Sequence, residues 1–224
     1  MMLSSSLLAA AVSMAAISAE GVSVSPPSDR TTSSIAQPPI EQQTLSYVGR
    51  LDQRGLDAIE LLVLHATETP NLASAREFAE VIHYSGSQTG NSGHFYVDRD
   101  GRVVQYVALD RVAHHVRGHN SRSIGIELVN TGRFPNWFDS QSQDWTDPYP
   151  DEQVKALLVL IKTLKTKCPN LRWISRHSDL DQREIAAEDQ PDVMIRRKLD
   201  PGATFPWQVV QQQSGLLPWS EPMP

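Results

Sequence analysis

The sequence has a single cysteine, Cys168, among 224 residues. One cysteine cannot form an internal disulfide, and it cannot supply a cluster of cysteine ligands for zinc. A metal site in this chain must therefore use histidine and carboxylate ligands. The chain also lacks a His-Glu-x-x-His motif, which argues against a zinc peptidase that carries this motif on a helix.

An excess of positive charge is also absent. The formal net charge is -6, and residues of both signs are spread along the chain. Binding to nucleic acid needs a basic face that neutralises phosphates, so we expect no nucleic-acid partner. With 224 residues and 40% hydrophobic composition, the chain can bury the core of one domain plus appendages.

Long apolar runs are missing too. The most apolar stretch, MMLSSSLLAAAVSMAAISAEG, is too short and too weakly apolar for a spanning helix. It has no charge before Glu20 and is typical of a secretory signal over residues 1–19, although no Lys or Arg lies near its start; the alternative is a disordered tail. No cysteine follows directly that could carry a lipid. We expect an exported protein of the periplasm or cell envelope, neither lipid-anchored nor stably inserted in the membrane.

The next segment, residues 20–46, is rich in Ser, Thr, Pro and Gln and has few large apolar side chains. Such a composition buries too little surface to offset the entropy of ordering and predicts a flexible tether. The folded domain is therefore expected over residues 47–224.

Hydrophobic periodicity within the domain predicts strands alternating with helices. Strands are expected at 59–65, 123–130 and 171–175, and a hairpin at 94–107 turns at Asp100-Gly101. Helices are expected at 74–84, 151–170 and 205–213, the first with Phe78, Val81 and Ile82 on one face. This order predicts a single α/β domain with a central mixed sheet flanked by helices.

Two of the seven histidines follow predicted strands. His65 follows the apolar run of residues 61–64, which has Ile59 just upstream, and His177 follows the strand in LRWISR. Ligand clefts of open sheets lie at such carboxyl ends of strands. Two imidazoles fixed there would supply two of the three protein ligands of a catalytic zinc site.

The residues alone leave the third ligand open. Asp179 lies near His177 but could instead cap backbone amides, and His94 could be a core residue. Asp200 precedes a Pro-Gly turn that would preorganise its carboxylate. The other candidates are His114 and His115, in a loop-like stretch. Lys198 either faces the same cleft as Asp200 or is an ordinary surface lysine.

Glu127 stands out within the strand SIGIELVN. Alternation places Ile124, Ile126 and Leu128 on one face, and Gly125, Glu127 and Val129 on the other. A carboxylate inside an apolar strand is costly unless it has a partner or a function. It is either in a salt bridge with Arg122 or Arg133, or a general base with a raised pKa. Its position does not discriminate between the two.

Five sequence blocks resemble, in order, the signature blocks of zinc-dependent N-acetylmuramoyl-L-alanine amidases of the type 2 family: VLHAT, GHFYVDRDGRVVQYV, AHHVRGHNSRSIGIELVNTG, RHSDL and RKLDPGATFPW. The resemblance is strongest to the branch of anhydro-muropeptide and envelope amidases. Phage lysozyme-type amidases and peptidoglycan recognition proteins are more distant relatives. The resemblance covers roughly residues 47–224 and implies the fold that these families share.

The resemblance implies a role for six residues. His65, His177 and Asp200 fall on the ligands of one zinc ion per chain. Glu127 falls on the catalytic glutamate, and Lys198 on the lysine that stabilises the oxyanion. His115 falls on a histidine that we assign to substrate binding. The implied reaction cleaves the amide between N-acetylmuramic acid, or its anhydro form, and L-alanine of the peptidoglycan stem peptide. Peptidoglycan or muropeptides are thus the expected partners. The alternative is a non-catalytic recognition module, which the retained ligands disfavour.

The sequence departs from the family pattern in three places. His114 stands where a tryptophan is usual, and Gly93 where phage-type members have a tyrosine. The segment 178–199 between the second and third expected ligands is longer than in the shortest members. We expect this loop to overhang the cleft and to change substrate access.

Overall fold

The computed structural model describes residues 39–220. The predicted signal and most of the predicted tether lie outside these residues. The first strand, β1 (Glu41–Gln42), already belongs to the main sheet, where it pairs with β6 (Val103–Gln105). The sheet therefore includes residues upstream of Tyr47, at which the domain was predicted to begin.

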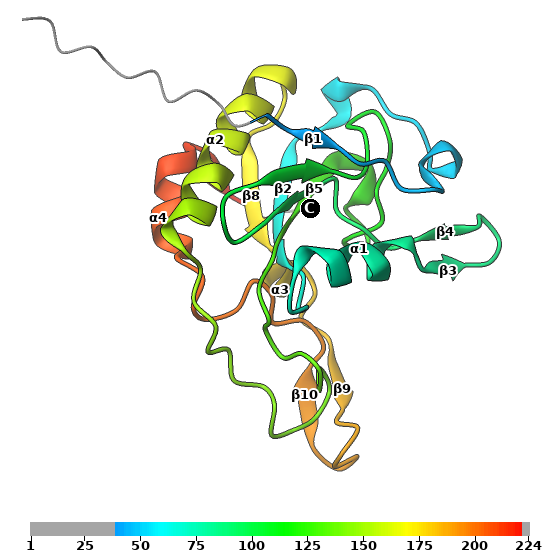
Figure 1. The fold of residues 1–224 in the computed structure, drawn as a ribbon, viewed down its shortest axis with the longest axis vertical. Helices are drawn as coiled ribbons and strands as arrows, with labels where there is room; N and C mark the ends of the chain where they lie inside the picture. The colour runs from blue at the N-terminus through cyan, green and yellow to red at the C-terminus, as the bar shows by residue number, and fades with distance from the viewer. Residues whose placement is uncertain (1–38, 221–224) are drawn as a thin grey trace, which may run out of the picture. The chain divides into compact units, whose positions relative to one another are not determined.

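The main sheet has seven strands in the order β1-β6-β5-β7-β2-β8-β11 (Figure 1). Its centre is three parallel strands: β7 (Ser123–Leu128), β2 (Leu61–Ala66) and β8 (Trp173–Arg176). The hairpin of β5 (Phe95–Val97) and β6 supplies the antiparallel pair, and β11 (Leu217–Pro218) closes the other edge. The predicted mixed sheet is confirmed.

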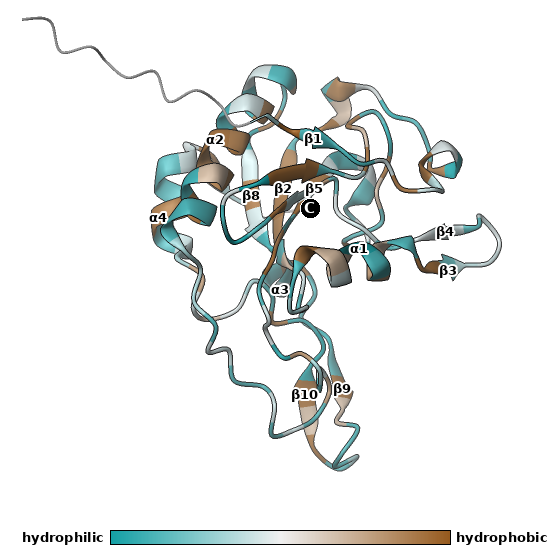
Figure 2. Cartoon of the chain, viewed as in Figure 1, coloured by the Kyte–Doolittle hydropathy of each residue, from teal (hydrophilic) through white to brown (hydrophobic). Residues whose placement is uncertain are grey.

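Helices cover both faces of the sheet (Figure 1). On one face α2 (Asp151–Lys167) and α4 (Trp207–Ser214) pack on apolar side chains such as Leu62 and Ile126. On the other, α1 (Leu72–Glu80) packs with Tyr96. Strands buried on both sides must be apolar throughout, which explains why residues 61–64 are apolar without alternation. Figure 2 shows these strands as a hydrophobic centre.

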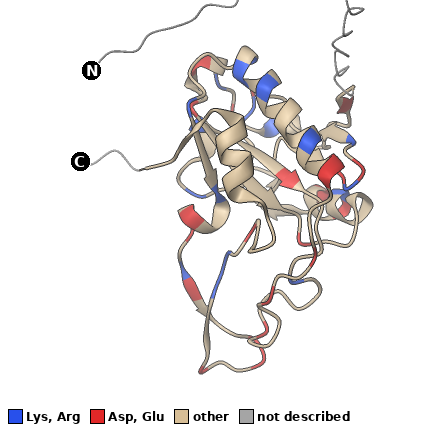
Figure 3. Ribbon diagram, turned by 90° about the vertical axis from the view of Figure 1, so that its left-hand side faces the viewer, with Lys and Arg blue, Asp and Glu red and all other residues tan. Residues whose placement is uncertain are grey.

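Helix α2 has the charge arrangement that stabilises a helix. Acidic residues occupy its first turn and lysines its last, complementing the helix dipole. Its lysines are exposed, while Leu157, Leu160, Ile161 and Leu164 are buried. Figure 3 shows Lys and Arg interspersed with Asp and Glu over the domain.

The predicted helix at 74–84 is only partly right. Helix α1 ends at Glu80, and Ile82–Tyr84 forms β3, which pairs with β4 (Thr89–Gly90). The expected buried face is also wrong, because Phe78, Val81 and Ile82 are 47%, 45% and 41% exposed. The buried side chains are instead small ones, Ala75 and Ala79, which belong to one apolar cluster with Tyr96. The β-branched pair at 81–82 favours the extended backbone that ends the helix.

The remaining elements are short. A turn with Gly101 at φ +88° joins β5 to β6, as the Asp-Gly pair predicted. The short helix α3 (His177–Leu180) follows β8, and the predicted loop beyond it contains the hairpin of β9 (Glu184–Ala186) and β10 (Met194–Arg196). This hairpin projects away from the sheet (Figure 1). Three 3-10 turns lie at Val48–Arg50, Leu56–Ala58 and Asn120–Arg122. Between residues 39 and 220, each helix is too short or too polar to cross a membrane.

Candidate metal centre and active site

The carboxyl ends of the central strands place two functional side chains next to each other. In the parallel pair of β2 and β7, His65 is the register partner of Glu127. Register partners on parallel strands point to the same face, so both side chains project from the face opposite α2. The same face of β7 carries Gly125, whose missing side chain leaves room above the sheet.

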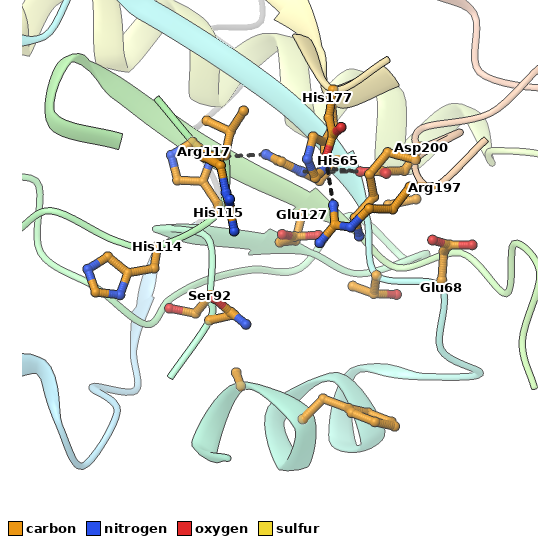
Figure 4. A pocket seen from close by; sticks show the side chains of 18 of the residues that line it. His65, Glu68, Ser92, His114, His115, Arg117, Glu127, His177, Arg197 and Asp200 are labelled. Atoms are coloured by element: carbon orange, nitrogen blue, oxygen red, sulfur yellow. Dashed lines mark hydrogen bonds and ion pairs between the residues drawn. The ribbon is translucent and has the colours of Figure 1, made fainter. Parts of the chain in front are cut away.

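His177 and Asp200 complete a cluster with His65. His177 is the first residue after β8, and Asp200 immediately precedes the turn at Pro201-Gly202. His65 Nδ1 lies 3.0 Å from His177 Nδ1 and 3.1 Å from Asp200 Oδ2, and the latter two atoms are 3.0 Å apart. All three side chains are buried. Figure 4 shows them converging from three segments of the chain.

This cluster fits a metal ion. Two imidazole nitrogens and one carboxylate oxygen, all within 4.8 Å of one another, form a donor set that suits zinc. Asp200 Oδ1 is buried and has no hydrogen-bond partner among the described residues, which is costly unless a cation compensates for it. Asp179, an alternative third ligand, is exposed and pairs with Arg176 at 2.8 and 2.9 Å, outside the cluster.

The electrostatics of the cluster favour the protonation states that metal ligands need. Burial and the neighbouring His177 lower the pKa of His65 to about 4, so this ring is neutral at pH 7. Burial would raise the pKa of Asp200, but the neighbouring His177 and Lys198 hold it well below its usual range. A neutral imidazole and an ionised carboxylate are the forms that bind metal.

Glu127 lies beside this cluster in a pocket that glycine opens. A Cβ at Gly93 would come within 2.9 Å of Glu127 Cγ, so a larger residue there would displace the carboxylate. Burial and the negative charge of Asp200 raise the pKa of Glu127 well above its ordinary value, while Lys198 opposes the shift. A raised pKa is the property expected of a general base near neutral pH.

The salt-bridge interpretation of Glu127 is wrong. Arg122 pairs instead with Glu60 near the start of β2. Arg133 makes a buried bidentate pair with Glu68, with nitrogen–oxygen distances of 2.7 and 3.0 Å. Both arginines that were candidates for Glu127 therefore have other carboxylates as partners.

A cleft of about 650 Å³ opens over the cluster. Lys198 lines it, which was one of the two positions left open for this residue. His114 lies further along the cleft (Figure 4). His115 also lines it, but its Nδ1 lies 3.0 Å from His65 Nε2, on the side of that ring away from the metal cluster. His94 is buried below His115, where its Nδ1 accepts a hydrogen bond from the Gly125 N–H.

Sequence reasoning missed the residues that shape the cleft walls. The Glu68–Arg133 pair joins the segment after β2 to that after β7, and Arg133 also donates to the carbonyls of Arg196 and Arg197, just before Lys198. The sequence signal that could have indicated this pair is that two oppositely charged residues, Glu68 and Arg133, follow shortly after two central strands. The walls also include aromatic and charged side chains, among them Phe78, Trp137, Phe138, Arg117, Asp181 and Arg197.

Comparisons with known proteins agree with this geometry. The AmpD 1,6-anhydro-N-acetylmuramyl-L-alanine amidase from Enterobacter cloacae is 34% identical over 139 residues, 58% of each chain. The N-acetylmuramoyl-L-alanine amidase AmiD from Escherichia coli K12 is 33% identical over 128 residues, 54% of this chain and 40% of AmiD. The chain thus spans 58% and 40% of the lengths of these curated relatives.

A solved structure has the same fold. It is the complex of E. coli AmiD with the substrate anhydro-N-acetylmuramic acid-L-Ala-D-gamma-Glu-L-Lys, which matches 75% of this chain and 62% of that chain with a TM-score of 0.53 and 26% identity. The model of the N-acetylmuramoyl-L-alanine amidase family, which is zinc-dependent in general, matches residues 55–203. Together with the cluster and the fold, this match shows that the chain belongs to the N-acetylmuramoyl-L-alanine amidase family.

Proposed function

We propose that this protein hydrolyses the amide bond between N-acetylmuramic acid, or its anhydro form, and the L-alanine of the peptidoglycan stem peptide. The observation that carries the proposal is the convergence of His65, His177 and Asp200 beside Glu127 in one cleft. The relatives AmpD and AmiD are N-acetylmuramoyl-L-alanine amidases by name. The role belongs to cell-wall degradation, remodelling or recycling.

His65, His177 and Asp200 would hold one zinc ion per chain. When bound, zinc acts as a Lewis acid that polarises a carbonyl and lowers the pKa of water. The chain's own contribution is a set of neutral and anionic ligands that are held in place before the metal arrives. Each comes from a different strand end or turn, so the sheet fixes their separation.

Glu127 would move the proton in this reaction. It accepts the proton of the attacking water and then donates it to the leaving amine of L-alanine, the usual two roles of one carboxylate in amide hydrolysis. Its raised pKa suits both steps, because a carboxylate of ordinary pKa would be a poor acid near pH 7. Lys198 would offset the negative charge that develops on the carbonyl oxygen.

The cleft walls support a ligand that carries both a sugar and a peptide. Phe78 and Trp137 pack edge to face with ring centroids 5.6 Å apart, and both line the cleft. Arg117 lies on the cleft as well (Figure 4). The ligand in the AmiD complex combines an anhydro sugar with a peptide of alanine, glutamate and lysine.

We also propose that the protein is exported. The support is the apolar segment of residues 1–19, which lies outside the described residues. The mature chain would begin near Glu20 and lie in the periplasm or envelope. The mass of the protein from cell fractions tests this: a full-length chain with Met1 in the cytosol would contradict export.

The activity is tested with purified protein of measured zinc content. It is incubated with intact sacculi and, side by side, with anhydro-muropeptides, and the products are identified by mass. We expect free stem peptides beginning with L-alanine and a sugar with a free lactyl carboxylate. His177→Ala serves as the inactive control. Binding of both substrates without any amide cleavage would favour the recognition module instead.

A further inference from the structure

His115 is positioned to act on His65 rather than only on a ligand in the cleft. Its Nδ1 lies 3.0 Å from His65 Nε2, and its Nε2 lies 3.2 Å from Ser123 Oγ. Ser123 is fully buried at the start of β7, on the same face of the strand as Glu127. The hydroxyl of Ser123 in turn lies 2.8 Å from the carbonyl oxygen of His119.

The direction of these three hydrogen bonds follows from the last one. A carbonyl oxygen can only accept, so the Ser123 hydroxyl donates its single proton to His119. Ser123 Oγ must then accept a proton from His115 Nε2. With both rings neutral, His115 Nδ1 is left as an acceptor, and the donor to it is His65 Nε2–H.

This series of hydrogen bonds leaves His65 Nδ1, which faces His177 and Asp200, without a proton. That tautomer is the one that can bind a metal through Nδ1. The opposite tautomer has a ready acceptor, because Asp200 Oδ2 lies 3.1 Å from His65 Nδ1 and would attract a proton there. Something must hold the proton on Nε2, and the relay through His115 and Ser123 does so.

The fold keeps His115 in place for this role. The backbone N–H groups of His115 and Val116 donate to Asn120 Oδ1 at 3.1 and 2.8 Å. The ring lies over Gly125, where a Cβ would come within 2.6 Å of His115 Cγ. Gly125 is therefore needed to admit the ring between β7 and the cleft.

We propose that His115 and Ser123 are positioning residues that fix the tautomer and orientation of His65 for metal binding. The proposal rests on the metal site of the proposed function. Partners of this kind behind a ligand histidine typically change metal affinity by about 10- to 100-fold when removed. They are usually a carboxylate or a carbonyl, whereas here a second histidine and a serine carry the hydrogen bond to a carbonyl.

The test compares Ser123→Ala with Ser175→Ala. Ser175 is also buried, on the other neighbour of β2, and its hydroxyl donates to the carbonyl of Arg176. At pH 8 the ¹⁵N shifts of the metal-free protein report the protonated nitrogen of His65, and competition with a chelator gives the zinc Kd. We expect an Nε2–H tautomer for His65 in the wild type and in Ser175→Ala. Ser123→Ala should shift the proton toward Nδ1 and weaken zinc binding by about 10- to 100-fold.

The two readouts separate this proposal from the proposed function. A His65 protonated on Nδ1 in the metal-free wild type overturns the relay, whatever the activity. So does a Ser123→Ala protein with unchanged tautomer and unchanged zinc Kd. If Ser123→Ala does not fold, the wild-type spectrum alone decides. An absence of amide cleavage together with the expected tautomer and zinc effects would refute the proposed reaction and leave the relay standing.

Discussion

Glu127 and His65 are direct register partners on two adjacent parallel strands, β7 and β2. This pairing fixes a carboxylate beside an imidazole of the candidate metal cluster through backbone hydrogen bonds rather than through a flexible loop. A one-residue slip in register would turn one of the two side chains to the opposite face, against α2. The apolar residues that alternate with them, Leu64 and Ile126, make such a slip costly because they would enter the cleft.

Replacing Glu127 by Gln tests the proposed general base. The amide keeps the size of the side chain but cannot accept the proton, so kcat should fall about 100- to 10,000-fold. Zinc content should not change, because Glu127 is not one of the three clustered ligands. Glu77→Gln, at an exposed position on α1, is the matched control and should keep wild-type turnover. A zinc-loaded Glu127→Gln enzyme with normal kcat would remove this residue from the mechanism.

Replacing Lys198 by Met tests the proposed oxyanion partner. Methionine keeps most of the side-chain length but not the charge, so kcat should fall about 100- to 1,000-fold, the usual effect of one oxyanion donor. Zinc should be retained, which elemental analysis checks. Lys162→Met, on the exposed side of α2, is the control. Loss of zinc from Lys198→Met would show instead that the lysine maintains the ligand cluster.

Replacing Asp200 by Ala tests the third ligand. Among residues 39–220 the cluster offers three ligand atoms, so losing one should abolish tight zinc binding and activity together. Asp179→Ala is the natural comparison, because this aspartate was the nearest alternative in sequence but pairs with Arg176. We expect it to keep one zinc per chain. If the zinc contents of the two variants are reversed, the ligand assignment is wrong.

The sequence predicted the centre of the molecule better than its edges. Strand β2, with His65 near its carboxyl end, was predictable because an apolar run without alternation has one stable place, the middle of a covered parallel sheet. In β7, Ile124, Ile126 and Leu128 alternate with Gly125 and Glu127, and this alternation predicted that Glu127 lies on the opposite face from the isoleucines. In each case, local pattern and tertiary environment agree.

Residues whose roles depend on distant partners were not predictable. Ser123 shares the face of Glu127 by simple alternation, but its contact with His115 depends on how the loop before β7 folds back. Phe78 has the spacing of a core residue yet is 47% exposed and lines the cleft, whereas Ala75 and Ala79 of the same helix are buried. Glu68 and Arg133 are 65 residues apart and meet only because β2 and β7 are neighbours.

His94 should make the stability of the fold depend on pH. It is fully buried, and burial together with the positive charge of Arg54 lowers its pKa to about 3. In the unfolded chain a histidine has a pKa of about 6.5. The unfolded state therefore binds one proton more than the folded state between these values. This contribution to the free energy of unfolding is complete above about pH 6.5 and is lost progressively as the pH falls toward about 3.

Urea unfolding of metal-free protein between pH 4.5 and 8 measures this effect. The proton on His94 should add a slope of up to about 1.4 kcal/mol per pH unit below pH 6. His94→Gln keeps a polar side chain at this position but cannot take up the proton. We expect it to be less stable than the wild type at pH 8 and to lose stability less steeply on acidification. His83→Gln, at an exposed position on β3, should keep the wild-type slope. Suppose that the free energy of unfolding depends on pH equally in the wild type and in His94→Gln. The acid sensitivity would then come from other groups, because the substitution removes the side chain that takes up a proton on unfolding.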